Sequence, residues 1–276
     1  MRKTLSLLLL TLGCQLAAQA ATSITAKEGS LQAGLAFYWD FDNGSTDYKS
    51  ATGMTMGIPT GIQAVNQHAT GGIRNSGYIS SFNDPARIDF YSGLGGSNIK
   101  ANAFTMSLKI SGLTADYRSM LCFTLGGQSF NLQTSNPGDG NQIALYGSGG
   151  GAPTLLTGSN TNNLLKGSEW ANVVLTSDGT NLTMYVNNLK VATAYAPDAS
   201  TTLSNVQLSS MWGDSGRAAN ANYDDFAIWN RALNDKEIQH LTSGGTAGDL
   251  IPEPATATLS LLGLASLMMR RRRRAA

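Results

Sequence analysis

The chain has 276 residues, with 19 Lys and Arg against 18 Asp and Glu and a formal net charge of +1. This balance hides two unlike parts, because residues 21–254 carry 12 basic and 18 acidic residues, a net charge of about −6. An acidic chain lacks the positive surface that nucleic acids and anionic lipids need, so we expect no nucleic-acid partner. Of the two cysteines, Cys14 falls in the predicted leader, and Cys122 alone cannot form an internal disulfide.

Residues 1–20 read as a secretory signal peptide. Arg2-Lys3 supplies the positive n-region, residues 5–12 the apolar h-region, and Ala18-Gln19-Ala20 a small-residue cleavage site. We therefore expect a short N-terminal helix that signal peptidase removes during export. The alternative is a lipoprotein, although Thr11-Leu12-Gly13-Cys14 departs from the Leu-first pattern of a lipobox.

The middle of the chain, after a lead-in at 21–34, is predicted to be all β. In Ala103 to Ile110, apolar and polar residues alternate, which is the pattern of a half-buried strand. Asp178-Gly179 is a turn signal between two further strands, 170–176 and 182–186. Many short strands broken by turn residues predict a sandwich or a barrel. The other expected strands are 118–125, 129–132, 141–146, 189–195, 203–212 and 223–229.

One helix is predicted after the last strand. Asn234 can cap it, and Glu237 three residues later can complete a capping box, while Leu233 and Ile238 stand at the positions of a hydrophobic staple. Glycines follow its end, and we expect residues 243–251 to be a flexible linker.

Three segments resemble the LamG-type jelly roll, which is related to concanavalin A-like lectins and glucanases. Phe37 to Asp42 resembles its opening strand, Trp170 to Val186 its central hairpin, and Tyr223 to Ile238 its closing strand and helix. The resemblance covers residues 35–242 and implies one domain of two curved antiparallel sheets packed face to face. It does not imply a single function.

Catalysis is not expected. The related glucanases place Glu, Asp and Glu at alternate positions of one strand, and no predicted strand has that pattern. Glu169 is the one glutamate of the predicted sandwich, and Asp224 and Asp225 are adjacent, so in a regular strand they would face opposite ways. The histidines His68 and His240 have no nucleophile motif beside them, so we expect surface roles. A hydrolase or lyase with carboxylates from distant loops stays open.

The resemblance also implies a structural calcium between the first and last strands. Asp40 or Asp42 together with Asp224 or Asp225 would supply the oxygen ligands. The alternative is that these acids accept bonds from backbone amides or pair with Arg231.

Sugar binding requires aromatic rings and polar side chains at one place. Trp212 ends a predicted strand and leads into a polar loop, so we expect a rim site there. The tryptophans matching core or strand-end positions of the family, Trp39, Trp170 and Trp229, are expected to be structural. The rim site would consist of Trp212, Asp214, Arg217 and Asn222.

The C-terminal residues 252–276 have three parts. Pro252, Glu253 and Pro254 come first, and an uncharged run at 255–269 is shorter than the ~20 residues of a stable membrane span. The cluster Arg270, Arg271, Arg272, Arg273 and Arg274 would stay on the cytoplasmic side. These parts resemble a PEP-CTERM sorting signal, which implies a hydrophobic helix held briefly in the inner membrane and cut near the proline pair by an exosortase. A plain tail anchor is the alternative.

The sequence thus predicts an exported protein of the surface, outer envelope or matrix of a Gram-negative-type bacterium. Its LamG-like domain would be a non-catalytic module for carbohydrate binding or adhesion, with glycans or exopolysaccharide as partners. The alternatives are a glycan-active enzyme and a structural matrix protein without a small ligand.

Overall fold

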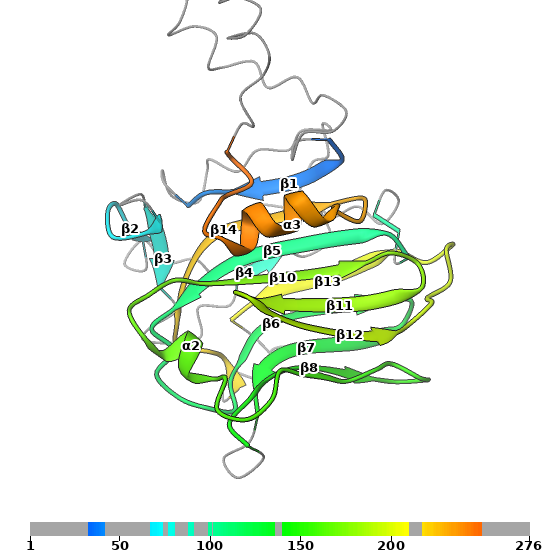
Figure 1. The fold of residues 1–276 in the computed structure, drawn as a ribbon, viewed down its shortest axis with the longest axis horizontal. Helices are drawn as coiled ribbons and strands as arrows, with labels where there is room; N and C mark the ends of the chain where they lie inside the picture. The colour runs from blue at the N-terminus through cyan, green and yellow to red at the C-terminus, as the bar shows by residue number, and fades with distance from the viewer. Residues whose placement is uncertain are drawn as a thin grey trace, which may run out of the picture.

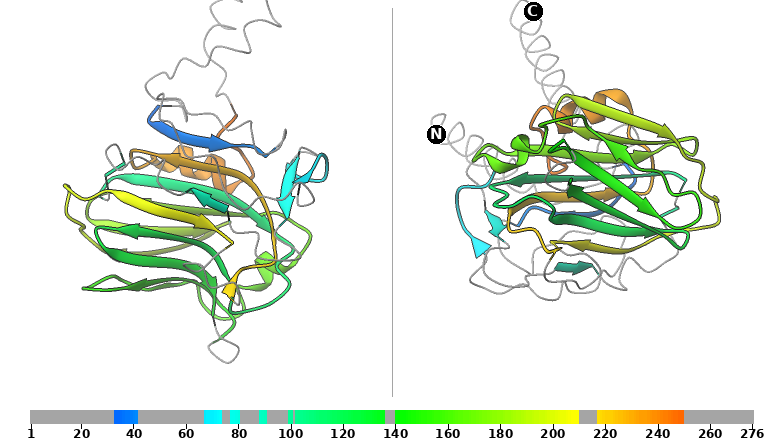
Figure 2. Two further views of the ribbon diagram at one scale, coloured as in Figure 1. Left: turned by 180° about the vertical axis from the view of Figure 1, so that it is seen from behind. Right: turned by 90° about the horizontal axis from the view of Figure 1, so that it is seen from below.

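A computed structural model describes residues 33–41, 67–73, 77–80, 88–90, 99–100, 102–135, 140–209 and 217–249. These residues form two antiparallel sheets that pack face to face, as expected for a jelly-roll sandwich (Figures 1 and 2). The predicted signal helix, the sorting motif and the C-terminal hydrophobic helix lie outside the described residues. Within the described part, no helix has the length and apolar character needed to cross a membrane.

The first sheet has eight strands, and β14 lies near its middle. Strand β1 pairs with β14 away from the main path, so the first and last strands of the domain are neighbours. The strand order is β12 (Leu189–Ala194), β11 (Asn181–Val186), β10 (Ala171–Ser177), β5 (Phe104–Ser111), β14 (Asn222–Trp229), β3 (Tyr78–Ser80) and β2 (Gln67–His68), with β1 spanning Leu35–Trp39.

The second sheet has six strands, all antiparallel to their neighbours. Its inward side chains pack against those of the first sheet. For example, the ring centroids of Phe104 and Phe123 are 6.3 Å apart. The core is continuous across both sheets. The strand order is β4 (Ile88–Phe90), β13 (Leu203–Leu208), β6 (Ser119–Leu125), β7 (Gln128–Thr134), β8 (Ile143–Ser148) and β9 (Leu155–Leu156).

Among the described residues, two short helices accompany the sheets. The first, α2 (Asn163–Lys166), has four residues and was not predicted. The second, α3 (Asp235–Thr242), begins with the predicted capping box: the Asn234 side chain accepts from the Glu237 N–H, and the Glu237 side chain accepts from the Asn234 N–H. Figure 1 shows α3 across the outer face of the eight-stranded sheet.

Strand β5 was predicted to be half-buried, but it is buried on both faces. Its inner face joins the core, and its outer face is covered by α3 and the residues after it. Lys109 on that outer face is fully buried, and its ammonium donates to the Leu241 carbonyl at 3.0 Å, to the Gly245 carbonyl at 2.6 Å and to Asn172. The cation thereby satisfies one carbonyl in the last turn of α3 and one in the segment that follows it.

The segment after α3 differs from the flexible linker that we expected, because residues 243–249 pack on the domain. Ala247 is 3% exposed and belongs to the same apolar cluster as Leu233, Ile238 and Trp229. Asp249 Oδ2 lies 3.0 Å from His240 Nε2 and accepts from the Thr246 N–H at 2.8 Å. We call residues 243–249 the C-terminal strap.

Candidate functional site

The predicted rim site is described only at Arg217 and Asn222, because Trp212 and Asp214 lie outside the described residues. The Arg217 guanidinium stacks 3.4 Å from the centroid of the Tyr117 ring. Its Nε donates to the Tyr117 carbonyl at 3.2 Å, and its Nη2 donates to Gln133 Oε1 at 2.7 Å. Arg217 therefore joins the β5–β6 connection to the end of β7.

Asn222 starts β14 and bonds elsewhere. Its Nδ2 donates to the Ser111 hydroxyl at 3.3 Å, across the pair that these two residues form between β14 and β5. Arg217 and Asn222 thus hold the two ends of the β5–β6 connection.

The acidic residues of the predicted calcium site lie around a β-bulge. The register of β14 against β5 shifts between Asp224 and Ala227, and Asp225 has a φ of 48°. The expected regular alternation of Asp224 and Asp225 therefore does not hold. Asp224 accepts from the Ile73 N–H at 2.7 Å and from the Asp225 N–H at 2.8 Å.

Asp225 accepts a 2.5 Å bond from the Tyr38 hydroxyl. Burial, together with the neighbouring Asp225 and Asp40 carboxylates, raises the pKa of Tyr38, so this hydroxyl stays a donor. Asp42 lies outside the described residues. Within the described ranges, no group of three or more His, Cys, Asp and Glu comes together to hold a metal ion. The alternative expectation, in which these acids accept from backbone amides, matches the bonds of Asp224.

A groove of about 420 Å³ opens at the other end of the six-stranded sheet. Three connections build it: the β6–β7 turn, the loop between β8 and β9, and the loop between β12 and β13. The residues that carry its polar chemistry are Gln128, Tyr195, Asp198 and Thr201, with the backbone of Gly150 beside them.

One wall of the groove is held by a chain of hydrogen bonds. The Tyr195 hydroxyl donates to Gln128 Oε1, and Gln128 Nε2 donates to the Gly150 carbonyl at 2.6 Å. The Tyr195 ring also packs edge-on against Phe130, with centroids 5.6 Å apart, and burial raises the pKa of its hydroxyl. The half-buried Tyr195 therefore has a fixed orientation in the groove.

The β12–β13 loop also brings a carboxylate to the groove. Asp198 Oδ1 accepts from the Ser200 N–H at 2.8 Å, and this bond lowers the pKa of the exposed Asp198 carboxyl. No Lys, Arg or His lines the described groove. A ligand would meet one negative charge, one aromatic ring and several uncharged hydrogen-bonding groups.

Sequence reasoning missed this groove because its residues come from three turns that are distant in the chain. The available signal was the turn chemistry itself: Gly126-Gly127, Gly149 to Gly151 and Pro197-Asp198 mark the three connections. No pattern showed that these turns meet at one end of the sandwich.

Two antiparallel sheets that pack face to face define a jelly-roll β-sandwich protein. The chain belongs to the concanavalin A-like lectin/glucanases superfamily, because the Laminin_G_3 family matches residues 87–239, more than half of it. No curated protein sequence matches the chain.

Solved structures share this fold. One is domain 4 of AbnA, an extracellular GH43 arabinanase from Geobacillus stearothermophilus, in complex with arabinotriose; it is 17% identical, with a TM-score of 0.50, over 75% of this chain and 98% of that one. Another is the binding domain of botulinum neurotoxin serotype G, 13% identical, with a TM-score of 0.52, over 76% of this chain and 50% of that one. At these identities the likeness concerns the fold alone.

Proposed function

We propose that this protein is an exported, non-catalytic module that binds carbohydrate through the groove at the β6–β7 end of the sandwich. The observation that carries the proposal is the fixed Tyr195 ring with the Gln128 amide beside it in an open groove of about 420 Å³. That volume is within the ~300–1,000 Å³ typical of small-ligand sites. The solved arabinanase domain in complex with arabinotriose supports the same ligand class.

The chemistry of the groove suits a sugar. An aromatic ring offers a face for the C–H groups of a sugar ring, and amide, hydroxyl and carbonyl groups can bond its hydroxyls. Since Tyr195 and Gln128 are already oriented by their mutual bond, little side-chain entropy is lost when a ligand binds.

We favour binding over cleavage because the described lining of the groove contains a single carboxylate. Hydrolysis of a glycosidic bond commonly uses two carboxyl groups on either side of it. Asp198 is the one carboxylate among the described lining residues, and its oxygen is engaged by the turn. A hydrolase or lyase remains the second candidate function and is separated by the experiment below.

The resemblance of residues 252–276 to a sorting signal supports a proposed place of action. Pro252, Glu253 and Pro254 begin three residues after the C-terminal strap, so we propose export, brief retention in the inner membrane and cutting by an exosortase, followed by release to the cell surface, outer envelope or matrix. The mass of the protein from the cell envelope tests this part: an end near Pro254 supports it, whereas retained Arg270 to Arg274 contradicts it.

The binding proposal is tested with the purified protein against arabinan, xylan, β-glucan and chitosan. Gln128→Ala is expected to weaken binding of a positive polysaccharide about tenfold, since it removes the bonds that orient Tyr195. Tyr185→Phe, on β11 outside the groove, is the matched control and should bind like the unchanged protein. Release of reducing ends would favour the enzyme, and no binding with no release would favour a structural matrix protein.

A further inference from the structure

A second group of aromatic side chains lies at the edge of the eight-stranded sheet. His68 on β2 and Tyr78 on β3 are directly opposite one another, and their rings stack with centroids 4.4 Å apart and planes 8° apart. Trp170, just before β10, meets Tyr78 edge-on at 5.7 Å. We call His68, Tyr78 and Trp170, with the adjacent Glu169, the aromatic platform.

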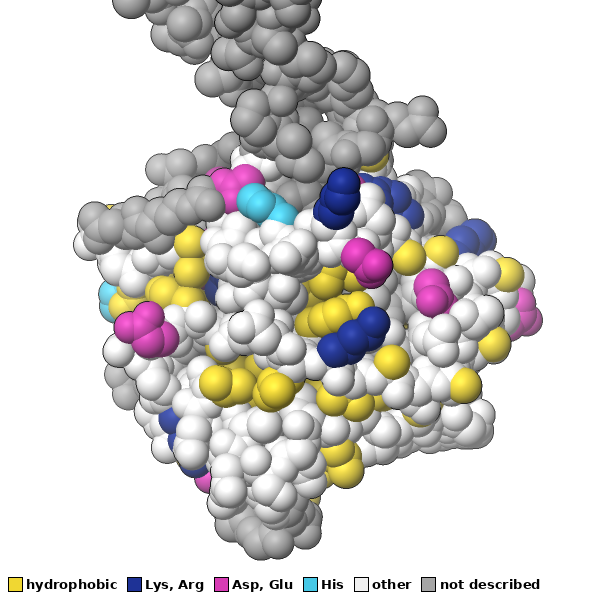
Figure 3. Space-filling model, in the orientation of Figure 1, with side chains coloured by type: hydrophobic (Ala, Val, Ile, Leu, Met, Phe, Trp, Pro, Cys, Tyr) yellow, Lys and Arg dark blue, Asp and Glu magenta, His cyan; other side chains and the backbone are white. Residues whose placement is uncertain are grey.

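The platform is open to solvent. His68 and Glu169 are exposed, and Tyr78 and Trp170 are half-buried, unlike the fully buried Trp39 and Trp229. Figure 3 shows hydrophobic side chains over the β2–β3 hairpin with a histidine at their margin. The earlier expectation that Trp170 is structural therefore accounts for only part of its surface.

The polar atoms of the platform form no hydrogen bond within the described part of the chain. Among the described residues, none forms a hydrogen bond with the Tyr78 hydroxyl, the Trp170 indole N–H, the His68 ring nitrogens or the Glu169 carboxylate. By comparison, the hydroxyl of Tyr195 in the groove bonds to Gln128. The platform thus presents flat apolar rings bordered by unused donors and acceptors.

We propose that the aromatic platform is a second carbohydrate-binding surface, for neutral sugars that stack a C–H face on its rings. The Tyr78 hydroxyl, the Trp170 N–H and the Glu169 carboxylate would bond the sugar hydroxyls. An apolar protein surface fits less well, because covering the platform would leave these polar groups without partners at a cost of about 1–3 kcal/mol each. An anionic polysaccharide would be repelled by Glu169.

The platform and the groove lie at opposite ends of the sandwich. Trp170 precedes Ala171, which pairs with Ile110 at the end of β5, whereas the groove is built on the β6–β7 turn. Figure 1 shows the β2–β3 hairpin at one end of the strands. One polysaccharide chain bound at each end would make the protein a cross-linker, a role beyond single-site binding.

The test uses the purified full chain and the neutral polysaccharides arabinan, xylan and β-glucan, with alginate as the anionic comparison. Binding is measured by affinity electrophoresis, and cross-linking by protein-dependent turbidity of the polysaccharide. We expect Trp170→Ala to weaken binding about tenfold and to abolish turbidity. Gln128→Ala should also abolish turbidity but leave the binding that the platform supplies.

Two further variants separate a binding role from a structural one. Trp170→Phe keeps an aromatic ring, although a smaller one, and loses the indole N–H, so it should retain the melting temperature and show intermediate binding. Glu169→Gln removes the negative charge from an exposed side chain and should weaken the discrimination against alginate.

Unchanged binding and turbidity in Trp170→Ala would overturn the platform, as would the absence of binding to every neutral polysaccharide. Loss of all binding in Gln128→Ala would also overturn it and leave the groove as the site. The reverse pattern, in which Trp170→Ala abolishes binding and Gln128→Ala has no effect, would sustain the platform and refute the groove.

Discussion

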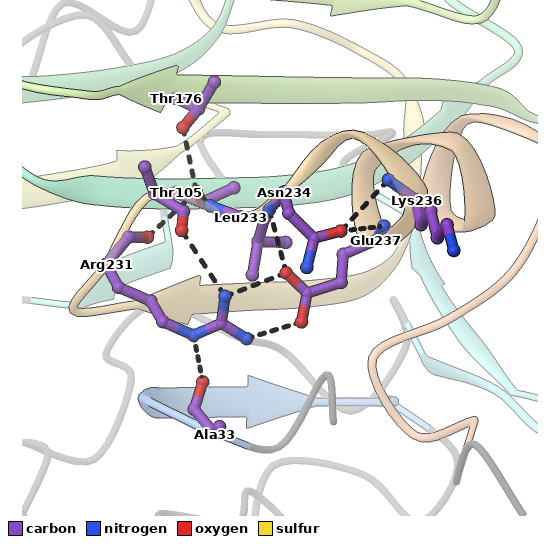
Figure 4. Close-up of polar contacts among 9 residues, drawn as sticks. Ala33, Thr105, Thr176, Arg231, Leu233, Asn234, Lys236 and Glu237 are labelled. Carbon is purple, nitrogen blue, oxygen red and sulfur yellow. Dashed lines mark hydrogen bonds and ion pairs between the residues drawn. The ribbon is translucent and has the colours of Figure 1, made fainter. Parts of the chain in front are cut away.

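Arg231 and Glu237 form a bidentate ion pair, with Nη1 2.8 Å from Oε2 and Nη2 2.7 Å from Oε1 (Figure 4). The same carboxylate accepts from the Asn234 N–H at 2.9 Å, and Arg231 Nε donates to the Ala33 carbonyl at 2.5 Å. One carboxylate therefore closes the capping box of α3 and anchors the arginine that binds the chain just before β1.

Glu237→Gln is expected to lower the free energy of unfolding by about 2–3 kcal/mol. This is less than the ~3–5 kcal/mol for breaking a fully buried pair, because the Arg231 side chain is 28% exposed. Denaturant unfolding measures the change. Asp235→Asn, one residue into the same helix but exposed, is the control and should change stability by less than about 0.5 kcal/mol. Equal effects of the two substitutions would contradict a stabilising role for the Arg231–Glu237 ion pair.

The same pair predicts a pH dependence. Burial alone would raise the pKa of the Glu237 carboxyl, but the bonds from Arg231 and the Asn234 N–H outweigh it and lower that pKa below its usual value. A carboxyl with a lowered folded pKa stabilises fully above its unfolded pKa and loses this contribution as the pH falls. The stability difference between the unchanged protein and Glu237→Gln should therefore shrink below about pH 4. A difference that grows on acidification would refute this.

Gly248→Ala is expected to displace the C-terminal strap. A Cβ at this position would lie 2.8 Å from the Tyr38 hydroxyl oxygen, which is held by its bond to Asp225. We expect a loss of about 1–3 kcal/mol and faster proteolysis within residues 243–249. Gly167→Ala is the control, because its Cβ would meet only the Glu169 nitrogen at 3.8 Å. Unchanged proteolysis would show that the strap does not depend on this close approach.

The calcium expectation is tested by the melting temperature. We expect no shift in millimolar calcium, because both oxygens of Asp224 and one oxygen of Asp225 already accept hydrogen bonds from the protein. A calcium-dependent rise that Asp225→Asn removes would restore the metal site. Magnesium at the same concentration controls for ionic strength.

Local sequence patterns predicted the features that depend only on residues close together in the chain. The capping box at Asn234 and Glu237 needs only a spacing of three residues, and the alternation of β5 follows from period two. The burial of Lys109 could not be predicted, since the carbonyls that it binds belong to Leu241 and Gly245 and arrive only when α3 packs on the sheet.

The candidate sites also combine features that local patterns predict with features that depend on distant contacts. Trp170 was recognised as a strand-start residue, but its neighbour Tyr78 comes from a hairpin that the pattern did not mark as a strand. The bulge at Asp225 needs a positive φ at a non-glycine residue, which composition and alternation do not signal. The groove and the aromatic platform are both built from segments that are distant in the sequence, so local patterns could not predict them.

The pairing of Leu35 with Trp229 constrains when the domain can form at all. Strand β14 is the shared neighbour of β1, β3 and β5, so a chain lacking it would leave three strands of the eight-stranded sheet with open, adhesive edges. Most of this sheet consists of contacts between distant residues, which makes folding slow. Synthesis would thus have to deliver an almost complete chain before the eight-stranded sheet could close.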